Sequence, residues 1–231
     1  MRSIVRGFGE LLITVGLLLL LFVAWQLWWT DVQANREQAG ITADLHKAWG
    51  DDALDPSTPV NADSGDPPVP AQPDGKEAFA IIHIPRFGQD YQPRPVLEGT
   101  SLDLLARGVG HYEDSALPGQ VGNFSIAGHR VTYGRPFNQV AELEPGDPIV
   151  IETEATWYVY RMRSHLIVTP DRVDVVAPVP EQPEAEPTER LLTLTACHPM
   201  YSARERYIVH AEFDRWQPKS AGEPAELQEV G

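Results

Sequence analysis

An apolar stretch near the start of the chain limits what this sequence can fold into. From Leu11 to Trp29 nearly every residue is apolar, and Gln26 is the only strongly polar residue inside the stretch. With the residues just before it, the run is roughly 20 residues long, which is enough for a helix to cross the hydrocarbon layer of a membrane. Because it is apolar all round, an amphipathic helix of a soluble domain is disfavoured. We therefore expect a transmembrane anchor over residues 7–29.

The flanks of this run predict its orientation. Arg2 and Arg6 precede it, Asp31 follows it, and three tryptophans lie between residues 25 and 29, as in an interfacial aromatic belt. The positive-inside rule then places residues 1–6 in the cytoplasm and the rest of the chain outside the cell. A cleaved signal peptide is disfavoured, because the run is long and lacks a small-residue cleavage site. The expected localisation is the cell membrane, with a single pass and an extracellular domain.

Composition divides the remainder of the chain into three parts. Residues 30–76 are expected to form a juxtamembrane segment, with a possible helix over 32–49, followed by a disordered linker rich in Pro and Asp. Residues 77–216 are expected to form the folded domain. Residues 217–231 are expected to be a disordered tail.

The pattern of the folded domain indicates a mainly β structure. Short apolar or alternating runs separated by Pro and Gly predict a sandwich or a closed barrel. Strands are expected at 78–84, 149–153, 156–168, 191–196 and 206–213, and short helices at 100–107 and 136–143.

Charge and cysteine content exclude several classes of protein. The chain has 33 Asp and Glu against 18 Lys and Arg, a formal net charge of −15, which argues against a nucleic-acid partner. Its single cysteine cannot form an intramolecular disulfide or a cysteine-based zinc cluster. We expect no cofactor and no metal site. Glu142, Glu144 and Asp147 could form a calcium-binding loop, although solvated acids are favoured.

Side-chain alternation along three segments brings chemistry-bearing residues onto one face. The segments cover residues 123–130, 191–199 and 202–211, and alternate residues of a strand point to opposite faces. His129, Cys197 and Arg206 each fall on the face away from the core. The core positions are predicted to be Phe124, Ile126, Leu192, Leu194, Ala196, Tyr207, Val209, Ala211 and Phe213.

These three residue types together suit attack on an acyl carbon. The thiol of Cys197 is the candidate nucleophile. A cysteine that served only for packing should point to the core face of its strand, and Cys197 points to the other face. The imidazole of His129 can take the thiol proton and later protonate a leaving amine. The guanidinium of Arg206 can donate hydrogen bonds to an oxyanion or position substrate carbonyls. No acidic third member is evident.

Two neighbouring residues compete for these roles. His198 directly follows Cys197, but alternation points it to the opposite face. Arg204 has the same parity as Arg206, so parity alone does not separate the two. The remaining histidines are expected to be ordinary, partly exposed residues: His83, His111, His165 and His210.

Two motifs resemble those of a known family. The segment Thr193–Pro199 (TLTACHP), with Arg206 nine positions after the cysteine, resembles the signature of the sortases. The segment Ala127–Phe137 (AGHRVTYGRPF) resembles the sortase histidine motif. Together they look most like class E sortases of actinobacterial type, over residues 77 to about 213.

The resemblance implies an eight-stranded β-barrel with His129, Cys197 and Arg206 in one groove. It implies cleavage of a C-terminal sorting signal of the LAXTG or LPXTG kind between Thr and Gly, through a thioester at Cys197. The partners would be surface proteins that carry such signals and an amine of a cell-wall precursor or a pilin. Tyr112 matches a family segment near the second position of the signal.

One departure from the family pattern lies beside the nucleophile. Many sortases carry Thr immediately before the cysteine, where this chain has Ala196. The supporting role of that hydroxyl in the oxyanion site would be lost or would shift to Thr195.

Two other functions remain open. An L,D-transpeptidase-like cysteine enzyme also joins peptidoglycan peptides, but it would place its histidine close to the cysteine in sequence. A tethered β adhesion or interaction module with an inert thiol would need no chemistry at all.

Overall fold

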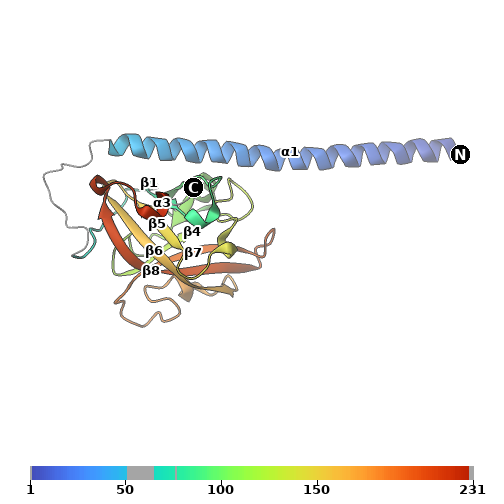
Figure 1. Ribbon diagram of the computed structural model, residues 1–231. Helices are drawn as coiled ribbons and strands as arrows, with labels where there is room; N and C mark the ends of the chain where they lie inside the picture. The colour runs from blue at the N-terminus through green and yellow to red at the C-terminus, as the bar shows by residue number, and fades with distance from the viewer. Residues whose placement is uncertain (1, 51–64, 76, 229–231) are drawn as a thin grey trace.

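Eight strands close into a barrel that forms the body of the molecule (Figure 1). The computed structural model describes residues 2–50, 65–75 and 77–228. The order around the barrel is β1-β2-β3-β4-β7-β8-β6-β5, so the predicted eight-stranded barrel with short helices is confirmed. The strands are β1 (Ala78–His83), β2 (Arg94–Glu98), β3 (Val109–His111), β4 (Gly122–Ala127), β5 (Pro148–Glu152), β6 (Thr156–Val168), β7 (Arg190–His198) and β8 (Glu205–Pro218). The helical elements are α1 (Arg2–Trp49), η1 (Pro85–Phe87), α2 (Leu102–Arg107), η2 (Val140–Glu142), η3 (Val173–Val176), η4 (Lys219–Ala221) and α3 (Ala225–Gln228).

The interior of the barrel follows the predicted alternation. Phe124 and Ile126 from β4 face Leu192 and Leu194 from β7 within one continuous core, and all four are fully buried. Ala196, Tyr207, Val209 and Ala211 belong to the same core, and Phe213 packs against it. The predicted core positions are therefore confirmed, and regular alternation holds along β7 and along β8 as far as Phe213.

Two strands were not anticipated from the sequence. β2 contains Pro95, which lies opposite Ile81 in the ladder, and β3 has only three residues with Gly110 at its centre. Proline and glycine normally indicate a turn, so neither segment carries a clear strand signal. The helix expected at 136–143 is limited to the single turn η2.

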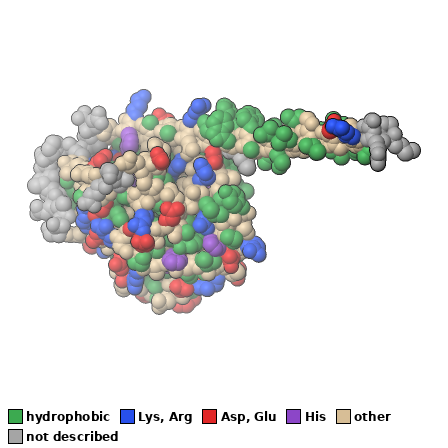
Figure 2. All heavy atoms as spheres, turned by 45° about the vertical axis from the view of Figure 1, so that its right-hand side comes forward, with side chains coloured by type: hydrophobic (Ala, Val, Ile, Leu, Met, Phe, Trp, Pro, Cys, Tyr) green, Lys and Arg blue, Asp and Glu red, His purple; other side chains and the backbone are tan. Residues whose placement is uncertain are grey.

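α1 is one continuous helix of 48 residues, which corresponds to about 72 Å. It is long and apolar enough to cross a membrane. Figures 1 and 2 show that its N-terminal part projects beyond the barrel and carries hydrophobic side chains. From Asp31 onward the helix contacts the barrel, where Ala34 and Gln38 are buried. The possible helix at 32–49 is therefore a direct continuation of the apolar segment.

Part of the expected linker lies against the barrel. Pro67 is buried, the Tyr158 hydroxyl donates to the Pro68 carbonyl at 2.6 Å, and Asp66 pairs with Arg190 at 2.6 Å. Backbone and acidic groups of residues 65–75 thus find partners on β6 and β7. Residues 51–64 of the expected linker lie outside the described residues.

Residues 217–228 end β8 and form η4 and α3 against the barrel, and residues 229–231 of the expected tail lie outside the described residues. Glu226 of α3 pairs with Arg161 and Arg215, each at 2.6 Å. Leu227 packs on an apolar cluster on the outer face of β5 and β6, formed by Val150, Trp157 and Val159. The composition of residues 217–231 gives no indication of these contacts, so they could not be predicted from the sequence.

A buried carboxylate joins three parts of the chain. Glu152 of β5 is 2% exposed. It contacts His83 of β1 at 2.9 Å, His46 of α1 at 2.9 Å and Lys219 of η4. A buried charge requires such partners, so Glu152 fastens the C-terminal end of α1 and the tail to the barrel.

We expect Glu152 to make stability depend on pH. Burial alone would raise the pKa of this carboxyl, but hydrogen bonds from His83 and Lys219 outweigh it and hold the pKa below the ordinary value of 4.5. The ionised form therefore stabilises the fold above the unfolded-state pKa, and this contribution is lost as pH falls through the folded-state pKa.

Urea unfolding at a series of pH values, from roughly pH 3 to pH 6, would measure this effect. Glu152→Gln should lose stability less steeply on acidification than the wild type, whereas exposed Glu154→Gln should follow the wild type. Equal slopes for Glu152→Gln and the wild type would contradict the assignment.

Candidate active site

Cys197 and Arg206 are opposite each other at the ends of two paired strands. The antiparallel register of β7 and β8 sets Ala196 against Tyr207 and Cys197 against Arg206. Directly opposed residues share a face of the sheet. Since Ala196 and Tyr207 belong to the core, Cys197 and Arg206 share the outer face. Cys197 is partly exposed, so the thiol is within reach of a substrate.

His129 approaches the same place from the neighbouring strand. β4 pairs with β7 in parallel, with Ala127 opposite Thr195. The Gly128 amide donates to the Thr195 carbonyl at 3.0 Å, so the pairing continues past the end of β4. Extended two residues past the end of β4, this register would set His129 opposite Cys197, and neighbouring strands lie about 4.8 Å apart. Cys197 and Arg206 thus lie near the ends of two paired strands, and His129 lies two residues beyond the end of the adjacent strand β4.

The surroundings of His129 favour a neutral imidazole. Its Nε2 atom is buried and has no hydrogen-bond partner among the described residues. The ring lies 5.1 Å from the ring of Tyr133, centroid to centroid. Burial disfavours the charged form and lowers the pKa of His129 below its ordinary value. A neutral ring with an unused nitrogen can accept a proton.

His198 is engaged elsewhere. Its Nδ1 atom accepts a hydrogen bond from Nη1 of Arg130 at 2.9 Å, and its ring lies 5.7 Å from that of Tyr207, a core residue. His198 therefore lies on the opposite side of β7 from Cys197, which favours His129 as the base.

Arg130 is a site residue that the sequence analysis missed. Its guanidinium is buried, donates to the Cys197 carbonyl at 3.4 Å as well as to His198, and lies 5.5 Å from the ring of Tyr207. This contact holds the backbone at Cys197. The only sequence signal was its position directly after His129, and alternation placed it on the opposite face.

Strand pairing separates the two candidate arginines. Arg206 lies within β8, and its Nη1 atom donates to the carbonyls of Ala203 and Glu205, both at 3.0 Å. Arg204 is exposed in the turn before β8 begins. Of the two, only Arg206 is a register partner of Cys197.

The two predicted substrate-binding residues contact each other. The Tyr112 hydroxyl and Thr195 Oγ1 lie 3.1 Å apart, and Thr195 also donates to the Ile126 carbonyl at 3.3 Å. Thr195 lies two residues before Cys197 on the same face. Tyr112 is therefore held beside the strand that carries the nucleophile.

Ala196 contributes to the core rather than to the catalytic face. Its side chain is 3% exposed and lies in the barrel interior. A hydroxyl at this position would enter the interior, opposite to the face of Cys197. Thr195 is the hydroxyl-bearing residue that shares the face of Cys197.

Two histidines expected to be partly exposed are buried instead. His111 is fully buried between Glu98, at 2.6 Å from Nδ1, and Ser115, at 2.9 Å from Nε2. His210 is 8% exposed and lies 2.9 Å from the Thr193 hydroxyl. Glu98 and Thr193 come from neighbouring strands of the barrel, and strand pairing could not be read from the sequence spacing of these residues.

Two of the three acids considered for calcium pair with an arginine through their carboxylates. Arg86 lies 2.5 Å from Glu144 and 3.3 Å from Asp147, and Glu142 accepts from Arg86 through its carbonyl. The negative charges of Glu144 and Asp147 are thus partly balanced by the guanidinium of Arg86.

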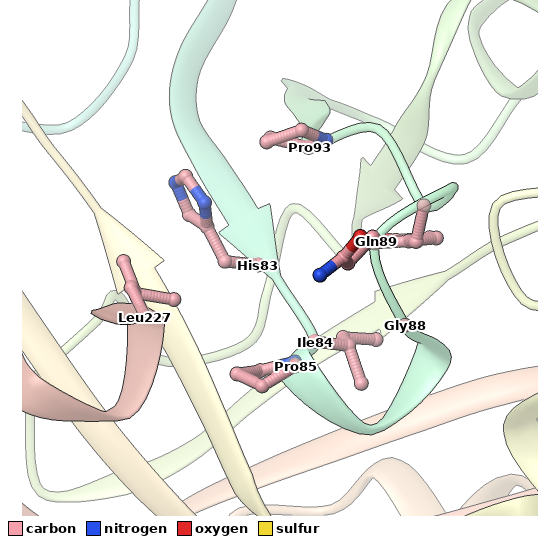
Figure 3. Close-up of a pocket in the computed structure, with 8 residues that line it drawn as sticks. His83, Ile84, Pro85, Gly88, Gln89, Pro93 and Leu227 are labelled. Atoms are coloured by element: carbon pink, nitrogen blue, oxygen red, sulfur yellow. The ribbon is translucent and has the colours of Figure 1, made fainter. Parts of the chain in front are cut away.

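A pocket elsewhere on the barrel lacks the groups for acyl transfer. It lies at the end of β1, around η1 and α3, and Figure 3 shows His83, Gln89, Pro93 and Leu227 around it. Its lining includes no cysteine, serine or carboxylate. The Nε2 atom of His83, its only histidine, lies 2.9 Å from Glu152.

The sequence of the barrel domain matches a known family. The sortase domain model matches residues 82–214, more than half of the chain. The chain therefore belongs to the sortase family.

Individual relatives indicate which class of sortase the chain resembles. The chain is 39% identical to sortase SrtE1 of Streptomyces coelicolor over 230 residues, which is 96% of this chain but only 60% of that protein. Sortase E1 of the same organism, solved with a tripeptide in the active site, aligns with a TM-score of 0.60 and 39% identity over 65% of this chain and 96% of that chain. The SrtA sortase from Actinomyces oris aligns with a TM-score of 0.69 and 40% identity over 74% of this chain and 99% of that chain. The predicted resemblance to class E is confirmed.

We expect His129 to titrate below its ordinary pKa of 6.5, because burial disfavours the imidazolium. Histidine-labelled full-length protein in detergent micelles can be titrated by NMR, with the His129 signal assigned from its absence in His129→Gln. A midpoint at or above 6.5 would contradict the buried, neutral state.

Proposed function

We propose that this protein is a membrane-anchored cysteine transpeptidase that cleaves a C-terminal sorting signal of the LAXTG or LPXTG kind between Thr and Gly. The observation that supports the proposal is the strand register: β7 and β8 oppose Cys197 to Arg206, and the pairing of β4 with β7 ends two residues before His129. Membership of the sortase family supports it.

The first half of the reaction forms a thioester. His129 takes the proton of the Cys197 thiol as sulfur attacks the threonine carbonyl carbon. The oxyanion receives hydrogen bonds from Arg206, whose Nε and Nη2 donors are not used by the bonds to Ala203 and Glu205. The protonated His129 then gives its proton to the glycine nitrogen, which leaves as an amine.

The second half transfers the acyl group. An amine of a cell-wall precursor or a pilin attacks the thioester and gives its proton to His129, and the Cys197 thiolate leaves and is reprotonated. A lowered pKa suits His129 to this role, because its neutral form predominates at neutral pH.

The proposed location is the outer surface of the cell membrane. The apolar part of α1 would span the bilayer once, with residues 1–6 in the cytoplasm and the barrel outside, as the flanking charges predict. The donors would be surface proteins that carry the sorting signal. Peptide binding is supported by the tripeptide in the active site of Streptomyces coelicolor sortase E1.

Formation of a covalent adduct tests the catalytic assignment. We expect the full-length protein in nanodiscs to form a thioester with a Leu-Ala-x-Thr-Gly peptide, detected by intact mass. Cys197→Ala should form none. His129→Ala should acylate about 10²- to 10⁴-fold more slowly, and Arg206→Ala about 10²- to 10³-fold more slowly.

Exposed Arg204→Ala is the matched control and should acylate within about twofold of the wild type, since it lies outside the strand pair. An adduct that survives Cys197→Ala would overturn the assignment. A wild-type thiol that alkylates slowly and forms no adduct would indicate an interaction module. Acylation by peptidoglycan peptides, but not by the sorting signal, would indicate L,D-transpeptidase-like chemistry.

Tyr112 is proposed to contact the second position of the signal, because its hydroxyl lies beside Thr195 on the nucleophile strand. We expect Tyr112→Phe to change the ratio of kcat/KM between Ala and Pro at that position by about tenfold. The rate of Cys197 alkylation should stay unchanged and serves as the control. An unaltered ratio would remove Tyr112 from the recognition site.

A further inference from the structure

The loop that carries His129 is bonded to α1 at several points. This loop, residues 128–137, is called the His loop below. Asp31 accepts from the Gly134 amide at 3.2 Å and pairs with Arg135 at 3.1 Å. Gln38 donates to the Tyr133 carbonyl at 2.9 Å. Three consecutive residues of the His loop therefore contact the helix that continues the proposed membrane anchor.

A buried arginine links the helix, the barrel and the His loop. Arg94 of β2 is 6% exposed. Its Nη1 atom donates to Asn35 Oδ1 at 2.6 Å and to Gln38 Oε1 at 2.7 Å, and its Nη2 atom donates to the Gly134 carbonyl at 2.8 Å. A buried guanidinium is costly unless its donors are satisfied. Asn35 and Gln38 thus supply acceptors that the barrel does not.

The contact is close enough to require glycine in the His loop. Gly134 has φ +75°, a conformation that favours glycine. A Cβ atom there would lie 2.7 Å from Asn35 Oδ1 and 3.1 Å from Arg94 Nη1. The loop therefore fits against α1 only without a side chain at this position.

The same loop shapes the surroundings of His129. The Phe137 amide donates to the His129 carbonyl at 3.0 Å, which closes the loop at its base. At its tip, Tyr133 places its ring 5.1 Å from the His129 ring, while its carbonyl is held by Gln38. Movement of the tip away from α1 would withdraw Tyr133 and admit water to the imidazole.

We propose that Asn35 and Gln38 are positioning residues for His129, which hold the His loop through Arg94 and the Tyr133 carbonyl. The inference rests on the proposed function, since it assigns part of α1 to the reaction of Cys197. Asp31, Asn35 and Gln38 recur at helical spacing and so share one face of α1. The membrane-proximal helix is accordingly part of the support of the active site.

A purely structural contact would stabilise the protein without affecting the chemistry. The helix provides a matched control, because Glu37 lies one residue before Gln38 and pairs with Arg107 of α2 at 3.2 Å, outside the His loop. Loss of either contact weakens docking of the helix, but only loss of the Gln38 contacts releases the His loop.

The experiment compares three full-length proteins in nanodiscs: the wild type, the double variant Asn35→Ala with Gln38→Ala, and the control Glu37→Ala. Each is measured by steady-state kinetics with a sorting-signal peptide and by NMR titration of His129. We expect the double variant to lose about tenfold in kcat with KM changed less than about twofold. Its His129 midpoint should rise toward 6.5 as the ring is hydrated. Glu37→Ala should match the wild type in both readouts.

Gln38→Met keeps the volume of the side chain and removes both of its hydrogen-bonding groups, so it replaces the double variant if that protein is unfolded by circular dichroism. Unchanged kcat and midpoint in an active, folded variant would overturn the inference, as would an equal loss in Glu37→Ala. A wild type that forms no thioester would refute the proposed function instead. The His129 midpoint would still test whether Asn35 and Gln38 hold the His loop in place.

Discussion

The pairing of β7 with its two neighbours is the constraint on which the rest of the site depends. Its antiparallel register with β8 opposes Cys197 and Arg206, and its parallel register with β4 leads His129 to the same end. A shift of one residue in either pairing would turn a site residue toward the interior. The buried residues Leu192 and Leu194 prevent such a shift, because it would expose them and bury polar groups. Core packing thus fixes the relative positions of the reacting groups.

Strand periodicity explains why much of the site could be predicted from sequence. Alternation alone separated Cys197 from Ala196, and the structure places them on opposite faces as expected. The limit of this reasoning is visible at Arg204 and Arg206, which share parity and differ only in strand pairing. Short strands with proline or glycine, such as β2 with Pro95, carry no periodic signal at all.

The parts that sequence could not predict depend on polar contacts between distant residues. Two buried charges on the barrel, Arg94 and Glu152, meet α1 at different points: Arg94 contacts Asn35 and Gln38, and Glu152 contacts His46. Nothing in the composition of residues 30–49 identifies these partners, because they lie at least 56 positions away along the chain. Residues 32–49 were therefore expected only as a juxtamembrane helix, whereas this helix supplies partners for both charges.

The unbroken course of α1 has a geometric consequence for access to the proposed enzyme. Asp31, which binds the His loop, is two residues beyond Trp29, or about 3 Å along a helix axis. With the apolar run in the bilayer, this end of the barrel would be held at a fixed height, level with the lipid headgroups at the membrane surface. Only peptides and amines presented within that thin layer would reach the thiol, so proximity to the membrane would itself select the substrates.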